Sequence, residues 1–343
     1  MKYNKQLTLK IIGADHIEQW LRAHPLRVFE RVRQVYLDHA QGRTVNPDSN
    51  FLCFPDSDIN RIIALPAALE DDNPIAGIKW IASFPHNVKL GIDRASALLI
   101  LNDRYSGYPL VCMEGCTISA ARTAASAAVG AHYLHPTSKY IRGLGIIGCG
   151  PISYRTVSFL LQLGWRIDSI SLNDLLPERA NLFLQKCAHY DIPCNITSQA
   201  EVIQSCDMVV FATSAVRPSV EQHHWFSHSP TVLHISLRDL APNVVQVAQN
   251  ITDDVTHCLR ANTSLELAWR AVGHHRFIDG DIADVIVGHI VPDPERPRIF
   301  SPFGMGVLDL ALARDIVTDL DVNNVLEICD FFPAPYQKQS KSY

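Results

Sequence analysis

The chain has 343 residues, of which 47% are hydrophobic and 19% are charged. This length suggests two domains, and this composition is typical of a globular protein and excludes an intrinsically disordered chain. The formal net charge of −5 excludes an electrostatic nucleic-acid binder, because acidic residues outnumber basic ones. We therefore expect a folded protein whose partner is a small molecule.

The N-terminal residues and the cysteines favour a cytoplasmic location. Lys2, Lys5 and Lys10 interrupt the N-terminal stretch too often for the apolar core of a signal peptide. No apolar stretch reaches the ~18 residues that a membrane-spanning helix needs. The nine cysteines include no CxxC pair, and their odd number is typical of reduced thiols. We expect no membrane partner.

The first region of the chain is expected to be α+β. Residues 13–42 have the apolar pattern of two helices, and Gly42 is a plausible stop. Apolar and β-branched stretches predict strands at residues 61–65, 75–83, 95–101 and 110–113. The connection at residues 102–109 has turn composition. These features predict a mostly antiparallel sheet.

The second region is expected to be α/β. An alanine-rich helix at residues 119–133 marks the junction, and strands and helices alternate from residue 136 onwards. Short apolar strands are predicted at residues 144–147, 169–173, 207–212 and 232–236. Such alternation predicts a Rossmann-type, doubly wound parallel sheet covered by helices. We expect a first domain at residues 1–119 and 313–343, and the Rossmann domain at residues 120–312.

A glycine-rich motif, Gly148-Cys149-Gly150-Pro151-Ile152-Ser153, joins the first strand of the Rossmann domain to a helix. Such glycines make a tight turn and let the backbone approach a pyrophosphate, which the helix N-terminus attracts. Asp174 ends the next strand about 20 residues further on, where an acid binds ribose hydroxyls and repels the 2′-phosphate of NADP. In isolation the glycines also fit an ordinary structural turn. The expected NAD-binding residues are Gly148, Gly150, Pro151, Ile152, Ser153 and Asp174.

Two further positions follow predicted strands of this sheet. Thr213 and Ser214 come after the strand at 207–212, and Asp239 comes after the strand at 232–236. Ligands of parallel sheets bind at this carboxyl edge, so we expect Thr213 and Ser214 to contact the cofactor and Asp239 to face the cleft. The alternatives are an ordinary strand-end turn and, for Asp239, a pair with Arg238 or a helix cap.

Two cations are candidates for substrate chemistry. Lys79 interrupts the apolar strand at residues 75–83, so it is either a gatekeeper on an edge strand or a functional amine in a pocket. Arg122 and Thr123 lie early in the alanine-rich helix. Because helix N-termini and guanidinium groups attract anions, this helix is a candidate carboxylate or phosphate site. The alternative for Arg122 is a solvated surface side chain.

The sequence contains none of the common metal or nucleophile motifs. His223-His224 and His274-His275 are adjacent pairs, which rarely share a metal ion, and there is no HExxH, P-loop or GxSxG sequence. We therefore expect no metal site.

These motifs together resemble the ornithine cyclodeaminase and μ-crystallin family over nearly the whole chain. The resemblance rests on Gly77-Ile78-Lys79-Trp80, Ile118-Ser119-Ala120-Ala121-Arg122-Thr123-Ala124-Ala125, the glycine-rich motif, Asp239, and Ile299-Phe300-Ser301-Pro302-Phe303-Gly304. It implies an NAD-dependent oxidoreductase that acts on an amino-acid derivative, and a homodimer formed through the first, substrate-binding domain. It also implies that Lys79 contacts the substrate near the reacting carbon and that Arg122 binds its α-carboxylate. Thr123 would lie near the cofactor phosphates, and Asp239 would handle water or an amine.

Residues 94–103, 113–119 and 46–49 are similar to one branch of this family, which releases 2,3-diaminopropionate for siderophores or antibiotics. The chain also departs from the cyclodeaminases, which carry a second carboxylate-binding arginine where Pro47 is followed here by Asp48-Ser49-Asn50. The resemblance therefore implies oxidative cleavage of N-(2-amino-2-carboxyethyl)-L-glutamate to 2-oxoglutarate and 2,3-diaminopropionate. The alternatives are an ornithine cyclodeaminase, an NAD(P)H-dependent imine reductase or amino-acid dehydrogenase, and a μ-crystallin-like binding protein without turnover.

Overall fold

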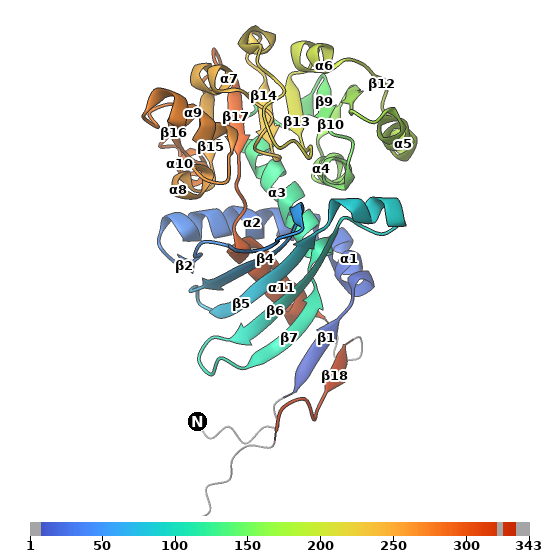
Figure 1. Cartoon of the computed structure of the whole chain (residues 1–343), viewed down its shortest axis with the longest axis vertical. Coiled ribbons are helices and arrows are strands. Elements are labelled where there is room, and N and C mark those ends of the chain that lie inside the picture. The colour runs from blue at the N-terminus through green and yellow to red at the C-terminus, as the bar shows by residue number, and fades with distance from the viewer. Residues whose placement is uncertain (1–7, 321–324, 334–343) are drawn as a thin grey trace, which may run out of the picture. The chain divides into compact units, whose positions relative to one another are not determined.

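The computed structural model describes residues 8–320 and 325–333 (Figure 1). The chain folds into two compact units, each built from separate segments. The first unit comprises residues 1–23, 43–119 and 306–343, and the second comprises residues 24–42 and 120–305. Helix α3 (Cys116–Leu134) begins in the first unit and continues into the second.

The first unit is built on a mixed sheet with the strand order β18-β1-β7-β6-β5-β4-β2, and β3 also pairs with β4. Strand β1 runs parallel to β7, while the other pairs are antiparallel. The expected antiparallel α+β region is therefore confirmed. Its elements are β1 (Leu9–Ile12), α1 (Ala14–Ala23), β2 (Thr44–Val45), β3 (Asn50–Phe54), β4 (Ser57–Leu69), β5 (Ile75–Ser83), η1 (Pro85–Leu90), β6 (Ala95–Asp103), β7 (Pro109–Glu114), α11 (Gly306–Asp319) and β18 (Leu326–Ile328).

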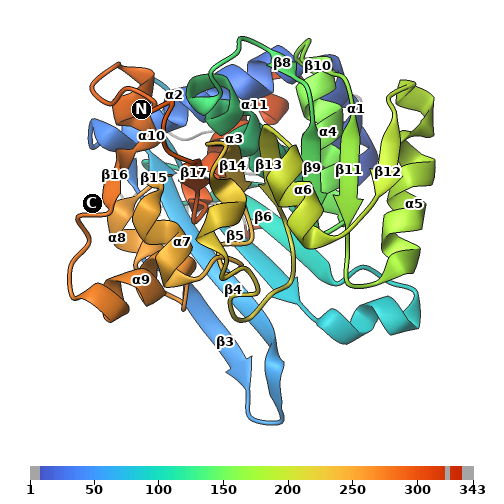
Figure 2. The same ribbon diagram turned by 90° about the horizontal axis from the view of Figure 1, so that it is seen from above.

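Helix α11 covers one face of this sheet and crosses strands β4, β5 and β6 (Figure 1). Its residues from 306 to 316 are all buried, so the helix is enclosed by protein on every side. Along β6 the side chains alternate, since Leu99 and Leu101 are buried while Leu98 is 51% exposed. The core of the first unit therefore lies between α11 and one face of the sheet. The β3–β4 hairpin extends beyond the rest of the sheet (Figure 2).

The second unit is built on a parallel sheet with the strand order β12-β11-β9-β13-β14-β17-β15-β16. All neighbouring strands in it are parallel, so the predicted doubly wound sheet is confirmed. Its elements are α2 (Pro25–Ala40), β8 (Tyr140–Ile141), β9 (Leu144–Ile147), α4 (Pro151–Gln162), β10 (Arg166–Ile167), β11 (Ile170–Asn173), α5 (Pro177–Cys187), η2 (Ala188–Tyr190), β12 (Cys194–Ile196), α6 (Gln199–Ser205), β13 (Met208–Phe211), η3 (His223–Phe226), β14 (Thr231–His234), α7 (Pro242–Val247), β15 (Gln249–Thr252), α8 (Val255–Cys258), α9 (Ser264–Val272), β16 (Ile278–Asp281), α10 (Ile282–Ile286) and β17 (Arg298–Ser301).

Helices cover both faces of this parallel sheet. On one face α6, α7 and α9 share a core with the strands, and Ile299 of β17 belongs to it. The next residue of β17, Phe300, points the other way and lies against Gly130 of α3, where a Cβ would be 2.4 Å from its ring. Because successive side chains of a strand point to opposite faces, α3 packs on the second face.

The boundaries of the two units differ from the predicted domains at two places. Residues 24–42 belong to the second unit, because α2 packs on α3: the Tyr36 hydroxyl donates to Ser126 at 2.8 Å and Arg33 donates to Tyr133 at 2.8 Å. Helix α11 begins at Gly306 and belongs entirely to the first unit, so residues 306–312 do not belong to the Rossmann unit. Along residues 8–320 and 325–333, no helix combines the length and hydropathy needed to cross a membrane.

Candidate active site

The glycine-rich motif lies at the carboxyl edge of the parallel sheet, between the neighbouring strands β9 and β13. The strand order reverses at this point, which is where doubly wound sheets bind their ligands. Gly148 has a φ of +91°, and a Cβ there would lie 2.6 Å from the carbonyl oxygen of Ala212, just after β13. Only glycine therefore fits this turn, and the loops that follow the two strands are in direct contact.

Helix α4 starts directly after this turn, with Gly150 as its N-cap and Pro151 and Ile152 as its first residues. Among the described residues no side chain caps this helix, and a Cβ at Gly150 would meet nothing within 4 Å. The helix N-terminus therefore has room for a phosphate group. Ser153 is buried, and its hydroxyl donates to the carbonyl of Gly148 at 2.5 Å, so it supports the turn from inside.

Asp174 connects the second strand of the sheet to the glycine turn. Its Oδ2 accepts the backbone N–H of Cys149 at 2.8 Å, and its Oδ1 accepts that of Leu176 at 2.9 Å. A carboxylate offers about four acceptor sites, so ribose hydroxyls can still bind to it. Burial, together with the charge of Asp174, raises the pKa of the Cys149 thiol to about 12. Cys149 is therefore protonated at neutral pH, and it packs rather than reacts.

Thr213 and Asp239 meet at the same edge of the sheet. The buried Asp239 carboxylate accepts hydrogen bonds from the hydroxyls of Thr213 and Ser236, while Ser214 beside them is exposed. Burial raises the pKa of Asp239, but the hydrogen bonds from His234 and the two hydroxyls outweigh it and hold this pKa below its ordinary value. Asp239 is therefore an ionised acceptor at neutral pH.

His234 is a neighbour of Asp239 that the sequence analysis missed. Its Nε2 lies 3.3 Å from Oδ2 of Asp239, and its Nδ1 lies 3.1 Å from the hydroxyl of Ser301. The side chain is only 1% exposed. The available signal was a histidine at the end of an apolar strand, since a buried imidazole requires polar partners. Together His234 and Asp239 form a buried pair that can hold or pass a proton.

Lys79 lies on β5 in the centre of the first unit's sheet, between Leu65 of β4 and Leu99 of β6. The interpretation as an edge-strand gatekeeper is therefore wrong. Its ammonium donates to Asp309 Oδ2 at 2.7 Å and to Ser119 Oγ at 3.1 Å. Asp309 lies on α11, and the side chains of the ion pair are 2% and 0% exposed. The sequence analysis did not find Asp309, because 230 residues separate the partners.

Helix α3 begins at Cys116, somewhat before the predicted start. The two carboxylate oxygens of Glu114 accept the N–H groups of Cys116 and Thr117 at 2.6 and 2.8 Å. The carboxylate of Glu114 therefore caps the N-terminus of this helix. The other group on α3 that was predicted to bind an anion is the guanidinium of Arg122, which lies in the second turn.

Arg122 and Thr123 are both half-buried on α3. A Cβ at Gly304 would lie 2.8 Å from Nη1 of Arg122, so the backbone at Gly304 packs directly against the guanidinium. The φ of +91° at Gly304 also requires glycine. Ser119, which binds Lys79, lies one turn earlier on the same helix.

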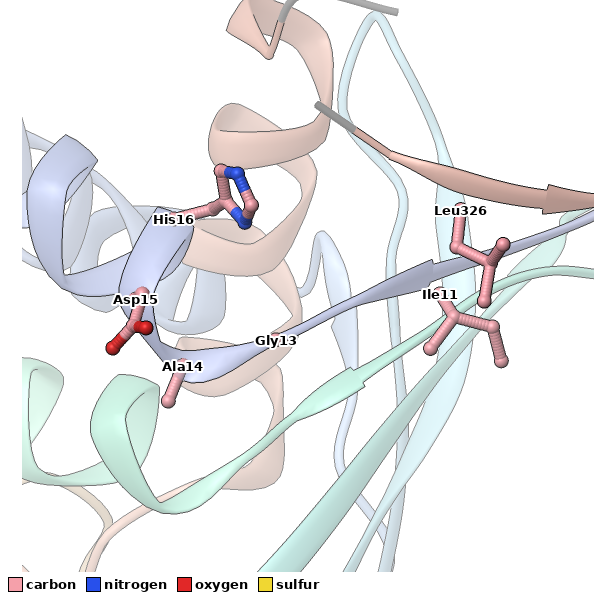
Figure 3. A pocket seen from close by; sticks show the side chains of 6 residues that line it. All are labelled: Ile11, Gly13, Ala14, Asp15, His16 and Leu326. Carbon is pink, nitrogen blue, oxygen red and sulfur yellow. The ribbon is translucent and has the colours of Figure 1, made fainter. Parts of the chain in front are cut away.

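A surface hollow of the first unit lies where β1 leads into α1 (Figure 3). It is lined by Ile11, Gly13, Ala14, Asp15, His16 and Leu326, which include none of the predicted site residues. Within residues 8–320 and 325–333, no group of three or more histidine, cysteine or acidic side chains is arranged to hold a metal ion.

Comparisons with known proteins give the same fold and a family. The N-((2S)-2-amino-2-carboxyethyl)-L-glutamate dehydrogenase of Staphylococcus aureus is 27% identical, and the match covers 92% of this chain and 91% of that protein. The Δ1-pyrroline-2-carboxylate reductase of Thermococcus litoralis, solved with NADH and L-proline, has a TM-score of 0.82 at 22% identity and covers 90% of this chain and 96% of its own.

An archaeal alanine dehydrogenase, solved as a dimer with bound NAD, has a TM-score of 0.83 at 23% identity and covers 95% of this chain and 100% of its own. These structural matches establish the fold. The family model for ornithine cyclodeaminase/mu-crystallin matches residues 25–322. Since that match spans both units, the chain belongs to the ornithine cyclodeaminase/mu-crystallin family.

Proposed function

We propose that this protein oxidises N-(2-amino-2-carboxyethyl)-L-glutamate with NAD and water, giving 2-oxoglutarate, 2,3-diaminopropionate and NADH. The observation that carries the proposal is the match over 92% of the chain to a relative named for the dehydrogenation of this compound. The product would be a precursor of siderophores or antibiotics. The free thiols of all nine cysteines suit a cytoplasmic enzyme.

The residues at the β9–β13 edge fit NAD, which supplies the hydride acceptor. The open N-terminus of α4 fits the pyrophosphate, and Asp174 fits the ribose hydroxyls. The negative charge of Asp174 disfavours the 2′-phosphate of NADP. We assign cofactor binding to Gly148, Gly150, Pro151, Ile152, Asp174, Thr123, Thr213 and Ser214, with Ser153 acting through the turn.

The protein's own groups would bind the substrate and move its protons. Arg122 binds a substrate carboxylate through its paired N–H groups. Removal of hydride from the glutamate α-carbon leaves a C=N bond, and Lys79 holds a proton at that nitrogen. Water adds to the carbon while the Asp239–His234 pair takes its proton. The C–N bond then breaks, and the amine leaves protonated as 2,3-diaminopropionate.

We further propose that a second copy of this chain covers the outer face of the first unit's sheet. This face, opposite α11, presents Trp80 and Leu98, which pair across β5 and β6 and are 41% and 51% exposed. Contiguous apolar side chains on a sheet mark an interaction surface. The archaeal alanine dehydrogenase with the same fold is a dimer, which supports a second copy as the partner.

The test is turnover of N-(2-amino-2-carboxyethyl)-L-glutamate, L-ornithine and L-alanine by the purified protein with NAD, with products identified by mass. The proposal predicts 2-oxoglutarate and 2,3-diaminopropionate with the first substrate alone. Lys79→Ala should lower this turnover by about 10²–10⁴-fold while NAD affinity stays within threefold, because the amine serves proton transfer. Proline from ornithine, pyruvate from alanine, or binding without any product would each overturn the proposal.

A further inference from the structure

Asp253 is a buried acid that the proposed reaction does not use. It follows β15 at the carboxyl edge of the parallel sheet and is 3% exposed. Strand β17 pairs with β15, and Thr252 is the register partner of Ser301. The segment that leaves β17 therefore starts beside Asp253, and both belong to the second unit.

The carboxylate of Asp253 binds the backbone of this segment with both oxygens. Oδ1 accepts the N–H of Phe303 at 2.8 Å, and Oδ2 accepts the N–H of Gly304 at 2.7 Å. Two consecutive N–H groups on one carboxylate fix both the position and the orientation of the loop. The loop cannot shift without breaking hydrogen bonds to a buried charged group, which is costly.

The same loop packs against the guanidinium of Arg122. A Cβ at Gly304 would lie 2.8 Å from Nη1 and 3.3 Å from Nη2, so only the absence of a side chain at Gly304 leaves room for the guanidinium beside this loop. The charges of Asp253 and Arg122 both affect the pKa of the nearby Tyr36 hydroxyl. Burial raises the pKa of Tyr36, the charge of Asp253 adds to this effect, and the Ser126 hydrogen bond and the charge of Arg122 oppose it.

We propose that Asp253 is a positioning residue, which holds the Phe303–Gly304 backbone against Arg122 and so fixes the direction of its guanidinium toward the substrate carboxylate. This role rests on the proposed function, in which Arg122 binds that carboxylate. A displacement of a binding group by about 1 Å can cost as much as 10²-fold in rate, so such a clamp has a measurable effect. The side chain itself does not touch the substrate in this account.

The kinetic test compares Asp253→Asn with the wild type in the presence of N-(2-amino-2-carboxyethyl)-L-glutamate. A carboxamide accepts through its oxygen only, so its NH2 group would face one of the two N–H groups that the carboxylate binds. KM is expected to rise about tenfold while kcat changes less than threefold. In an Arg122→Lys background the same substitution should change KM less than twofold, because the two residues act in series. An equal rise in KM in both backgrounds would overturn the proposal.

A second readout does not depend on turnover. The rate at which phenylglyoxal modifies Arg122, followed by peptide mass spectrometry, should rise at least threefold in Asp253→Asn as the loop loosens. Gly304→Ala, which places a methyl group against the guanidinium, should change this rate as well and serves if Asp253→Asn does not fold. Asp254→Asn is the matched control and should leave the rate unchanged. An unchanged modification rate in both test variants refutes the positioning role. If the modification rate changes but the wild type does not turn over the glutamate derivative, the positioning role is supported and only the proposed function is refuted.

Discussion

Lys79 and Asp309 form a buried ion pair in the first unit, with side chains 2% and 0% exposed. Removing one partner of such a pair leaves a buried charge without its counter-charge, at a cost of about 3–5 kcal/mol. We predict that Asp309→Leu lowers the free energy of unfolding by about this amount in urea denaturation. The double variant with Lys79→Met should recover most of the loss, because no lone charge remains buried.

The matched control for this prediction is an exposed ion pair in the same unit. Arg104 and Glu70 lie 2.5 Å apart, but their side chains are 43% and 34% exposed. Glu70→Leu should therefore cost less than about 1 kcal/mol. If Asp309→Leu and Glu70→Leu lower the free energy of unfolding by the same amount, burial does not determine how much the Lys79–Asp309 pair contributes to stability.

Asp174 is the residue that we expect to make the protein prefer NAD over NADP. Asp174→Asn keeps an oxygen that can accept the N–H of Cys149, but it removes the negative charge. A lost charge-assisted hydrogen bond costs about 1.5–3 kcal/mol, so NAD should bind at least tenfold more weakly. NADP should gain relative to NAD, because its phosphate is no longer repelled. Calorimetric titration of both cofactors measures this, and an unchanged ratio of the two affinities would contradict the assignment.

Individual residues differ in how far the sequence predicts their surroundings. The glycine turn and Asp174 were found because strand, turn and acid follow one another at short spacing. Asp309 was missed because its partner lies 230 residues away, and its helix has no polar face that would mark one charged residue. The role of Gly304 depends on Arg122, which is also far from it in sequence. Local sequence patterns therefore predict a loop and its residues, whereas contacts between residues far apart in sequence can be identified only once the fold is known.

At the scale of elements, helix α2 is attached to α8 by an ion pair. Nε2 of His39 lies 3.1 Å from Oδ2 of Asp254, and the side chains are 23% and 19% exposed. The hydrogen bond to Asp254 raises the pKa of His39 above its ordinary value of 6.5, against the effect of burial. The hydrogen bond from His39 in turn lowers the pKa of Asp254 below its ordinary value of 3.8, again against burial.

These shifts fix the direction of a pH effect. The contribution of His39 is fully present below pH 6.5 and is lost as the pH rises through its higher folded pKa, because folding then no longer favours the bound proton. The contribution of Asp254 is present above pH 3.8 and is lost as the pH falls through its lower folded pKa. The pair therefore stabilises the protein most between these two values.

We predict that His39→Asn destabilises the protein by about 1 kcal/mol at pH 5.5 and by clearly less at pH 8.5. Urea denaturation at the two pH values measures the difference. The control is His289→Asn, since His289 and Asp284 form an exposed pair with side chains 75% and 44% exposed. A loss of stability for His39→Asn that is the same at both pH values would contradict the assigned charge state.

Helices with one apolar face were located more accurately than helices without one. The predicted pair of helices within residues 13–42 is confirmed as α1 and α2, and the helix expected after the glycine-rich motif is α4. The C-terminal part of the first domain was expected to start at residue 313, whereas helix α11, with which it starts, begins at Gly306. Its residues are buried on all sides, so no helical period marks its start. Strand β18 was missed, because a short strand that pairs with β1 carries no pattern of its own.

At the scale of the whole molecule, the first unit presents the sheet face that we assign to a second copy. Leu98→Glu should convert the dimer to a monomer in size-exclusion chromatography with light scattering, because a buried carboxylate at the interface has no counter-charge. Leu182→Glu is the matched control, since Leu182 on α5 has the same 51% exposure. A monomeric wild type, or loss of the dimer in both variants, would refute this interface.

The two units also divide the proposed chemistry. The first holds Lys79 with Asp309, and the second holds the glycine turn, Asp174 and the Asp239–His234 pair. Alternating strands and helices predicted the second unit well, because each of its steps is local in sequence. The first unit is assembled from three chain segments, and a single sequence contains little information about such distant pairings.

In the proposed reaction the hydride is transferred from the substrate to the nicotinamide and is not returned, so it appears on NADH. The most direct measurement uses N-(2-amino-2-carboxyethyl)-L-glutamate with deuterium on the glutamate α-carbon, and analyses the nicotinamide and the products by mass spectrometry. We expect NADH with one deuterium, formed in equal amount to 2-oxoglutarate. Products without deuterium on the nicotinamide, or no products at all, would contradict it.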